Sequence, residues 1–546
     1  MSRQTEYKQN IPNRFLAQLK SDLIFRRIES GIRSLKANRH LFRCCRPGQK
    51  NAAVFLGYLA AWVDVGFAGP RVVQQLSVHF DKVARRNLTL INYLPLRMAE
   101  GFVAMSKGRH EQAIQYFETV LAFETETDDK ELMIITNFWI ARCKRIQGRY
   151  GDALRYAERA KRAALQMGYL NMHAVIQVFE AWCIFQEGRP AEARKILAEA
   201  EVVLQKTDDY VTLGNINSVY GRIAREEGNY DQALHRFASA IEEYKKRDAQ
   251  HRNVARTLIN VALVKRLLAP QLRAPSDRLV ANRGARASRT AHEAFSHRKQ
   301  LERYCREALK HLTEARFIYA QHNDDRGRAK IHIARGYLYL FNGEVGRAAS
   351  EGVAAYRIVC ESNDFALKAR ARILQSMVEF AGSEKQTGDN GNDGKFSQLS
   401  VELAREAVDY ANQTQHRSLI AHAYIRLGLA HCKNYSGDWE EAQQCYDKAT
   451  ALLKPKTDHY VWLELRVLKQ KLSSAGTIDS RLREWSQGAV GNKTFQQITE
   501  DFAAVVIPKV WALEGRKVSR VVERLSISPK KVRRILRAQG LGNGGS

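Results

Sequence analysis

Proline and long hydrophobic runs are both scarce in this chain. Only 10 of its 546 residues are proline, whereas alanine, leucine, arginine, glutamate and glutamine are abundant, so we expect a predominantly helical protein. Residues 52–69 are apolar apart from Asp64, but this stretch is short for a membrane span and glycines interrupt it. Residues 1–25 contain no continuous apolar run of the kind found in secretory leaders. We therefore expect a cytoplasmic protein that makes no membrane contact.

Cysteine pairs and catalytic signatures are also missing. The chain has eight cysteines but no C-x-x-C motif, so we expect buried, reduced side chains rather than zinc ligands or disulfides. It contains no G-x-x-x-x-G-K-[ST] phosphate loop, no H-E-x-x-H zinc motif and no G-x-S-x-G nucleophile elbow. The Gly-rich stretch at 388–394 lacks the acidic spacing of a calcium-binding loop. We expect no enzyme activity, no cofactor and no metal site.

Acidic residues are outnumbered by basic ones. The chain has 87 lysines and arginines against 58 aspartates and glutamates, which gives a formal net charge of +29. Such a charge favours a polyanionic partner, because basic side chains attract phosphates and release counterions. Charge alone does not distinguish DNA from RNA or from an acidic protein.

The middle of the chain repeats with a period of 40 residues. The repeat is marked by a recurring alanine, at Ala113, Ala153, Ala193 and Ala233. A glycine precedes each alanine by five residues, at Gly108, Gly148, Gly188 and Gly228. A small residue precedes each alanine by twelve residues, at Gly101, Ala141, Ala181 and Gly221. Two helices that cross at small residues and are joined by a glycine turn would produce this pattern.

These spacings resemble the tetratricopeptide repeat (TPR). Phe117 and Phe237 match the aromatic position of that repeat, whereas Ala157 and Leu197 depart from it. Later markers continue the series, at Ala262, Ala308, Gly336, Ala348, Ala404, Ala430 and Ala442. The resemblance implies an all-α fold with a TPR-like helical solenoid of eight or nine helix pairs over residues 51–455. We expect two insertions in it, a basic loop at 269–298 and a Gly/Asp-rich linker at 382–397.

In tetratricopeptide repeats the first helix of each pair lines a groove, and the resemblance therefore also implies a peptide-binding surface. The implied groove residues are Phe138, Arg142, Arg145, Val178, Trp182, Phe185, Ser218, Arg222 and Arg225. Because arginine binds carboxylates and phosphates through bidentate hydrogen bonds, this groove would suit an acidic or carboxylate-bearing peptide with apolar anchors. Alternatively, these arginines are solvated or pair with glutamates on neighbouring helices.

Two segments flank the solenoid. Residues 1–50 are basic and have helical spacing, and they could form either a capping helix or a second basic arm. Residues 456–493 predict a capping helix followed by a linker. The apolar face of that helix is expected to carry Tyr460, Leu463 and Val467.

The C-terminal segment, residues 494–546, reads as a helix followed by two shorter ones. Within it, residues 517–525 place Val518, Val521 and Val522 on one helical face. Ser528 is a suitable N-cap for the next helix, and Pro529 occupies its first position, where a missing N–H has no cost. That helix is expected to bury Val532, Ile535 and Leu536, and its exposed face is almost wholly basic.

Residues 515–541 resemble the Fis-type helix-turn-helix, the DNA-binding end of the factor for inversion stimulation and of nitrogen-regulator enhancer-binding proteins. Three features depart from that pattern: Ser526 replaces the turn glycine, Val521–Val522 replace two alanines, and Pro529 replaces an arginine. The resemblance implies a homodimer that reads a two-fold DNA site. The residues expected at DNA are Lys517, Ser519, Ser528, Lys530, Lys531, Arg533, Arg534 and Arg537.

Together these features predict a bacterial, cytoplasmic transcriptional regulator. Its solenoid would bind a protein or peptide partner, and its C-terminal helix-turn-helix would bind DNA. The alternative is a TPR scaffold for protein–protein complexes, whose basic tail contacts polyanions without reading sequence.

Overall fold

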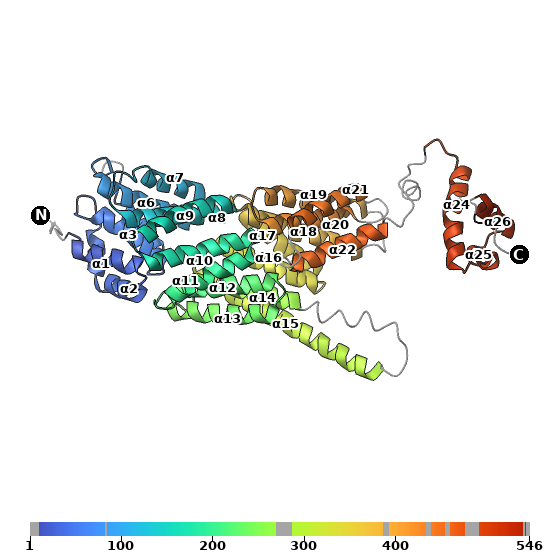
Figure 1. Ribbon diagram of the computed structural model, residues 1–546, viewed down its shortest axis with the longest axis horizontal. Coiled ribbons are helices and arrows are strands. Elements are labelled where there is room, and N and C mark those ends of the chain that lie inside the picture. The colour runs from blue at the N-terminus through green and yellow to red at the C-terminus, as the bar shows by residue number, and fades with distance from the viewer. Residues whose placement is uncertain are drawn as a thin grey trace. The chain divides into compact units, whose positions relative to one another are not determined.

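The computed structural model of the chain describes residues 10–81, 85–268, 287–385, 393–432, 438–453, 459–475, 491–538 and 541. All regular structure in these residues is helical (Figure 1). The helices form two compact units. The first comprises Met1–Leu427 with Asp447–Leu465, and the second comprises Gly428–Tyr446 with Arg466–Ser546.

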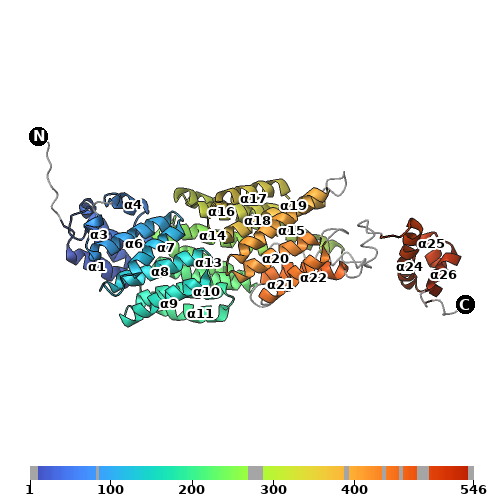
Figure 2. The same ribbon diagram turned by 90° about the horizontal axis from the view of Figure 1, so that it is seen from above.

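The first unit is built from successive helix pairs, which Figure 2 shows from above. The pairs are α6 (Leu90–Ser106) with α7 (His110–Leu121), α8 (Lys130–Ile146) with α9 (Tyr150–Gln166), α10 (Leu170–Gln186) with α11 (Pro190–Leu204), α12 (Tyr210–Glu226) with α13 (Tyr230–Arg247), α14 (Arg252–Leu268) with α15 (Ala287–Gln321), α16 (Asp325–Phe341) with α17 (Val345–Val359), and α18 (Phe365–Lys385) with α19 (Asp393–Asn412). The chain continues through α20 (Arg417–His431), α21 (Trp439–Leu452) and α22 (His459–Ala475). The all-helical, repeating fold that the 40-residue period predicted is therefore present.

Small residues at the predicted crossing points let the two helices of a pair approach closely. A Cβ atom added to Gly101 would lie 2.3 Å from Cε1 of Phe117, and one added to Gly221 would lie 2.7 Å from Cδ1 of Phe237. Larger side chains do not fit at these crossings without displacing the rings. The four marker alanines are completely buried, at Ala113, Ala153, Ala193 and Ala233.

The N-terminal segment packs against the solenoid. It contains α1 (Asn13–Ile24), α2 (Ile28–Ala37) and the short 3₁₀ helix η1 (Arg39–Cys44), and it is followed by α3 (Ala52–Asp64) and α4 (Arg71–Ser77). The indole Nε1 of Trp62 in α3 donates a hydrogen bond of 3.3 Å to the carbonyl oxygen of Leu19 in α1. Buried residues of 11–45 share one core with α3, α6 and α7, so this segment covers the end of the solenoid rather than forming a free arm.

The two predicted insertions are shorter than the sequence indicated, as far as the structure describes them. Helix α15 begins at Ala287, so residues 287–298 are helical rather than part of a loop, and 269–286 lie outside the described residues. Residues 287–298 contain neither proline nor glycine, which allows the helix to extend toward its N-terminus. Likewise α18 reaches Lys385 and α19 starts at Asp393, and the intervening 386–392 are outside the described residues.

Two of the three residues predicted on the apolar face of α22 are exposed, whereas the third, Tyr460, is half-buried. Leu463 and Val467 are 39% and 47% exposed, whereas Val461, Leu465 and Leu468 are buried. Apolar residues occur on more than one side of this helix, so periodicity alone did not determine which side is covered.

The second unit ends in three helices, α24 (Phe495–Leu513), α25 (Val518–Leu525) and α26 (Pro529–Ala538). Their small core contains Ile507, Val521, Val532, Ile535 and Leu536. Thr494 and Gln497 form a capping box at the start of α24. Between α25 and α26, Ser526 adopts the left-handed conformation with φ of +49°.

Candidate functional site

A pocket of about 430 Å³ lies between the first helices of six helix pairs, namely α8, α10, α12, α14, α16 and α18. A second pocket of about 230 Å³ adjoins it, and the two share Arg222, Arg256 and Arg370 in their linings. Both pockets belong to the first compact unit. Repetition of the helix pair therefore places corresponding helix faces around one space.

The structure brings all nine predicted groove residues to these pockets. Phe138, Arg142, Arg145, Val178, Trp182 and Ser218 line the larger pocket, Phe185 and Arg225 line the smaller one, and Arg222 lines both. Two of the predicted groove arginines have acidic partners, although neither partner is a glutamate on a neighbouring helix. Arg142 pairs with Asp64 of α3, and Arg225 pairs with the adjacent Glu226.

Aromatic rings form one wall of the larger pocket. The rings of Phe138 and Phe179 meet edge to face with centroids 5.5 Å apart. The guanidinium of Arg145 lies 4.8 Å from the centroid of Trp182 and 5.5 Å from that of Phe179. Cation–π contact thus holds Arg145 beside an apolar shelf formed by Phe138, Phe179 and Trp182.

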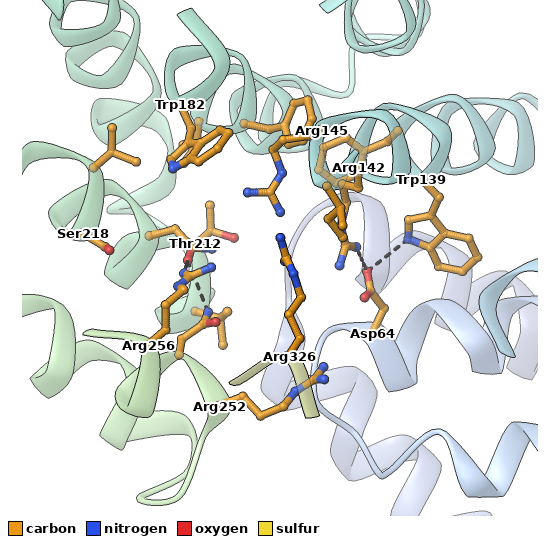
Figure 3. Close-up of a pocket in the computed structure, with 18 of the residues that line it drawn as sticks. Asp64, Trp139, Arg142, Arg145, Trp182, Thr212, Ser218, Arg252, Arg256 and Arg326 are labelled. Carbon is orange, nitrogen blue, oxygen red and sulfur yellow. Dashed lines mark hydrogen bonds and ion pairs between the residues drawn. The ribbon is translucent and has the colours of Figure 1, made fainter. Parts of the chain in front are cut away.

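The three aspartates that line the larger pocket already have partners. Asp64 accepts hydrogen bonds from Arg142 and, over 3.1 Å, from the indole Nε1 of Trp139 (Figure 3). Asp364 pairs with Arg326 and accepts a backbone hydrogen bond of 3.1 Å from Leu367 at the start of α18. Asp324 accepts a backbone hydrogen bond from Gly327 at the start of α16. These carboxylates hold helices and single arginines in place.

Nine arginine and lysine side chains line the same pocket, and several have no carboxylate partner. Within the described part of the chain, Arg145, Arg222, Arg256, Lys330 and Arg370 make no ion pair. Arg256 donates a hydrogen bond of 2.8 Å to the side-chain oxygen of Asn215. The buried Nε atoms of Arg145 and Arg256 have no hydrogen-bond partner among the described residues. We call these five residues the central basic cluster.

Burial and neighbouring positive charges lower the pKa values of three members of the central basic cluster. Burial, together with the charge of Arg256, lowers the pKa of Arg145 to about 10. Burial and the charges of Arg256 and Arg225 lower the pKa of Arg222 to about 9. Burial and the charge of Arg326 hold the pKa of Lys330 well below its ordinary value. Positive charge is therefore concentrated here against unfavourable desolvation and repulsion.

The sequence reasoning missed the pocket residues of α14 and α16, although a signal for them existed. Arg256 and Lys330 each lie six residues before the small residue of their repeat, Ala262 and Gly336. Extending the predicted groove face by one more helical turn toward the N-terminus would have reached these positions.

The residues predicted to meet DNA lie in α25, in α26 and beside them. Those that are exposed are Lys517, Ser519, Ser528, Lys530, Arg533, Arg534 and Arg537, and Lys531 is half-buried. The hydroxyl of Ser528 accepts a hydrogen bond of 3.2 Å from the backbone N–H of Lys531, as expected of an N-cap. Glu500 of α24 pairs with Arg534 and lies 3.4 Å from Nζ of Lys531.

Among the helices that the structure describes, none combines the length and the apolar character needed to cross a membrane. In the same residues, histidine, cysteine, aspartate and glutamate form no group of three or more that could hold a metal ion.

Comparison with known proteins identifies the repeats. Family models of the tetratricopeptide repeat match residues 96–166 and 423–460. No curated protein matched the sequence of the chain.

Several solved structures resemble the fold at low sequence identity. The apo form of the quorum sensor NprR from B. thuringiensis is 13% identical, with a TM-score of 0.46 over 71% of this chain and 97% of that chain. A human IFIT1 dimer with m7Gppp-AAAA is 15% identical, with a TM-score of 0.42 over 81% and 96% of the two chains. Yeast Tom70 is 11% identical, with a TM-score of 0.35 over 84% and 97%. The family-model matches and the observed helix pairs show that the chain contains tetratricopeptide repeats within an all-helical fold.

Proposed function

We propose that this protein is a DNA-binding regulator whose solenoid binds an acidic peptide or protein segment. The proposal for DNA rests on the α25–α26 hairpin, whose two short helices bury Val521, Val532 and Leu536 and expose a face rich in lysine and arginine. A basic helix that follows a tight turn on a small apolar core suits insertion into the major groove. The residues proposed at DNA are the eight named for the Fis-type helix-turn-helix.

The regulator is proposed to act as a homodimer through α24. Phe495 and Phe502 are 86% and 49% exposed, and they lie seven residues apart, which places them on the same side of the helix. Two large exposed aromatic side chains aligned along a helix suit contact with a second copy of that helix. Replacing Phe502 with glutamate should then produce monomers and weaken binding to a two-fold site.

The solenoid is proposed to receive its partner in the two adjoining pockets. The aromatic shelf of Phe138, Phe179 and Trp182 offers space for apolar anchors, and the central basic cluster offers donors for acidic groups. Binding there would supply the signal that the C-terminal unit turns into DNA occupancy.

The test is selection of the full chain on a randomised duplex pool at about 150 mM salt, close to physiological ionic strength. We expect enrichment of a two-fold motif. The double substitution Arg533→Ala, Arg537→Ala should weaken binding to all sequences and reduce the slope of log affinity against log salt by about 1 for each lost phosphate contact. Lys509→Ala, which removes one exposed charge from α24, serves as the matched control.

Uniform, salt-dependent binding without a motif would contradict the regulator proposal. It would favour a TPR scaffold whose basic tail makes nonspecific contacts. An unchanged salt slope in the double variant would show that the hairpin is not the DNA-binding element.

A further inference from the structure

The central basic cluster has more positive charge than a single carboxylate can balance. Its five members, Arg145, Arg222, Arg256, Lys330 and Arg370, come from α8, α12, α14, α16 and α18. The pocket's own aspartates are occupied by other arginines or by helix N-termini. An anion that enters the pocket therefore meets donors that no described carboxylate already satisfies.

Two members of the cluster, Arg145 and Arg256, extend into the pocket beside Arg326. Figure 3 shows the side chain of Arg145 directed across the pocket toward that of Arg326, with Arg256 beside them. Arg326 also pairs with Asp364, which fixes its position from the opposite wall. Guanidinium groups that approach from several helices can surround a compact anion. They surround an extended ligand with widely spaced single charges less completely.

The two common anionic groups of peptides differ in what they offer to such a cluster. A carboxylate has a single negative charge and two acceptor oxygens. A phosphoryl group has a charge of about −1.5 to −2 near neutral pH and three strong acceptor oxygens. Each guanidinium can donate a bidentate pair of hydrogen bonds to two oxygens. A phosphoryl group can therefore accept hydrogen bonds from several arginines at once.

Repulsion within the cluster adds to this preference. Arg145 and Arg256 are close enough that the charge of Arg256 depresses the pKa of Arg145. A ligand relieves this repulsion in proportion to the negative charge that it places between the two groups. A peptide that matched this charge with carboxylates alone would need several acidic side chains, whereas one phosphoryl group supplies it from a single side chain.

We propose that the central basic cluster binds a phosphoryl group, supplied by a phosphorylated peptide side chain or by a small phosphate compound. The inference rests on the proposed peptide-binding function of this pocket and specifies its anionic chemistry. The phosphoryl oxygens accept hydrogen bonds from Arg145, Arg222 and Arg256, and the remainder of the ligand lies against the shelf of Phe138, Phe179 and Trp182.

The first measurement is calorimetric titration of the full chain with inorganic phosphate, pyrophosphate and tripolyphosphate at matched ionic strength. Citrate is the control anion, because it carries several carboxylates and no phosphoryl group. We expect tripolyphosphate to bind most tightly and citrate to bind at least about tenfold more weakly than a phosphate compound of similar charge. Equal affinity for citrate would overturn the phosphoryl assignment.

Variants separate the pocket from the basic C-terminal hairpin, which also attracts phosphate. The substitution R145Q together with R222Q should weaken binding of tripolyphosphate at least about tenfold, the loss expected for removing charged hydrogen bonds. Arg155→Gln is the matched control, because Arg155 is exposed on α9 outside the pocket linings. An equal loss in the control variant, or no loss in the double variant, would overturn the proposal.

The stability of the unliganded variants shows whether they remain suitable for the comparison. Removing charges that repel each other in the empty pocket should leave the free energy of unfolding of the R145Q/R222Q variant unchanged or raise it. A clear destabilisation would assign Arg145 a structural role beside Trp182 instead. In that case R145K provides the second test, because lysine retains the charge but cannot donate the bidentate hydrogen bonds of a guanidinium. Undiminished phosphate affinity in R145K would contradict bidentate recognition by Arg145.

Degenerate peptides identify the source of the phosphoryl group and keep the two proposals distinct. Three peptide pools carry phosphoserine, glutamate or serine at one fixed position. The affinity of each pool is measured for the wild-type chain and for the R145Q/R222Q variant, and the loss in the variant is compared among the pools. Preference for phosphoserine supports a phosphorylated peptide, and binding of tripolyphosphate alone supports a small phosphate compound. If the glutamate pool binds as tightly as the phosphoserine pool and both lose binding in the double variant, the phosphoryl inference is overturned and the peptide function is preserved. If no pool loses binding in the double variant, both the phosphoryl inference and the proposed peptide function are contradicted.

Discussion

The backbone N–H of Gly151 donates a hydrogen bond of 2.7 Å to the side-chain carbonyl of Gln415, across 264 residues of sequence. The backbone N–H of Gln415 in turn donates a hydrogen bond of 2.9 Å to the carbonyl oxygen of Gly148. Beside them, His416 meets the ring of Tyr150 edge to face with centroids 6.2 Å apart. The turn before α9 and the turn before α20 therefore join two distant parts of the first unit next to the larger pocket.

Substitution of Gly148 should loosen this junction. Gly148 has φ of +82°, and an added Cβ would lie 2.9 Å from Cβ of Thr414, whereas Gly108 has φ of +76° and no atom within 4 Å of an added Cβ. Both Gly→Ala substitutions should lose about 1 kcal/mol through left-handed strain, and Gly148→Ala should lose at least about 1 kcal/mol more through the clash. Urea unfolding and hydrogen exchange at residues 414–417 measure this difference. Equal losses would mean that the junction contributes nothing to stability.

The N-terminal helices should depend on Gly31. A Cβ added there would lie 2.0 Å from the ring of Trp62, although Gly→Ala within a helix is ordinarily stabilising by about 1 kcal/mol. We expect Gly31→Ala to lower the free energy of unfolding by about 1–3 kcal/mol through overpacking. Gly69→Ala, where an added Cβ has no atom within 4 Å, should have little effect. Protection of α1 and α2 from proteolysis provides the local readout, and an unaffected Gly31→Ala variant would contradict the observed packing.

The turn of the C-terminal hairpin carries strain that glycine would relieve. Ser526 has φ of +49° and ψ of +43°, so Ser526→Gly should stabilise the hairpin by about 1 kcal/mol. The same substitution at Ser519, inside α25, should destabilise it by about 0.5 kcal/mol, because glycine is the poorer helix former. Hydrogen exchange of α25 and α26 measures both changes. Effects of the same sign at the two positions would contradict the turn conformation.

Acid should destabilise the first unit through buried histidines. Burial and the charge of Arg370 lower the pKa of His416 from 6.5 to about 3, and burial lowers the pKa of His251 to about 4. Between the unfolded and folded pKa values, the unfolded chain binds a proton that the folded chain does not. Stability should therefore fall as the pH drops below about 6.5, by up to about 1.4 kcal/mol per pH unit for each such histidine.

Denaturant unfolding at several pH values between 7 and 5 tests this expectation. His416→Gln should reduce the slope of the free energy of unfolding against pH, whereas substitution of the exposed His79 to glutamine should leave that slope unchanged. A slope that is the same in wild type and in His416→Gln would show that His416 is not a source of the acid sensitivity.

Much of the local structure was predictable because its causes are close together in sequence. Gly101 and Phe117 lie in consecutive helices of one pair, so a spacing pattern records their contact. Ser528 and Pro529 mark the start of α26 by local rules of capping and backbone geometry. The side of α22 that is buried was not predictable in this way, because it depends on which neighbours cover the helix.

The sequence by itself determined the repeating helix pairs, the lines of pocket-facing residues along their first helices and the basic surface of the C-terminal hairpin. Each of these follows from helical periodicity and from charge within a short segment. Only the tertiary structure decided that Arg145, Arg256 and Lys330 share one pocket. It also decided which of the pocket arginines are paired with an aspartate. Those relationships arise where successive helix pairs bring residues from distant repeats around a common space, and no local pattern specifies the distances between them.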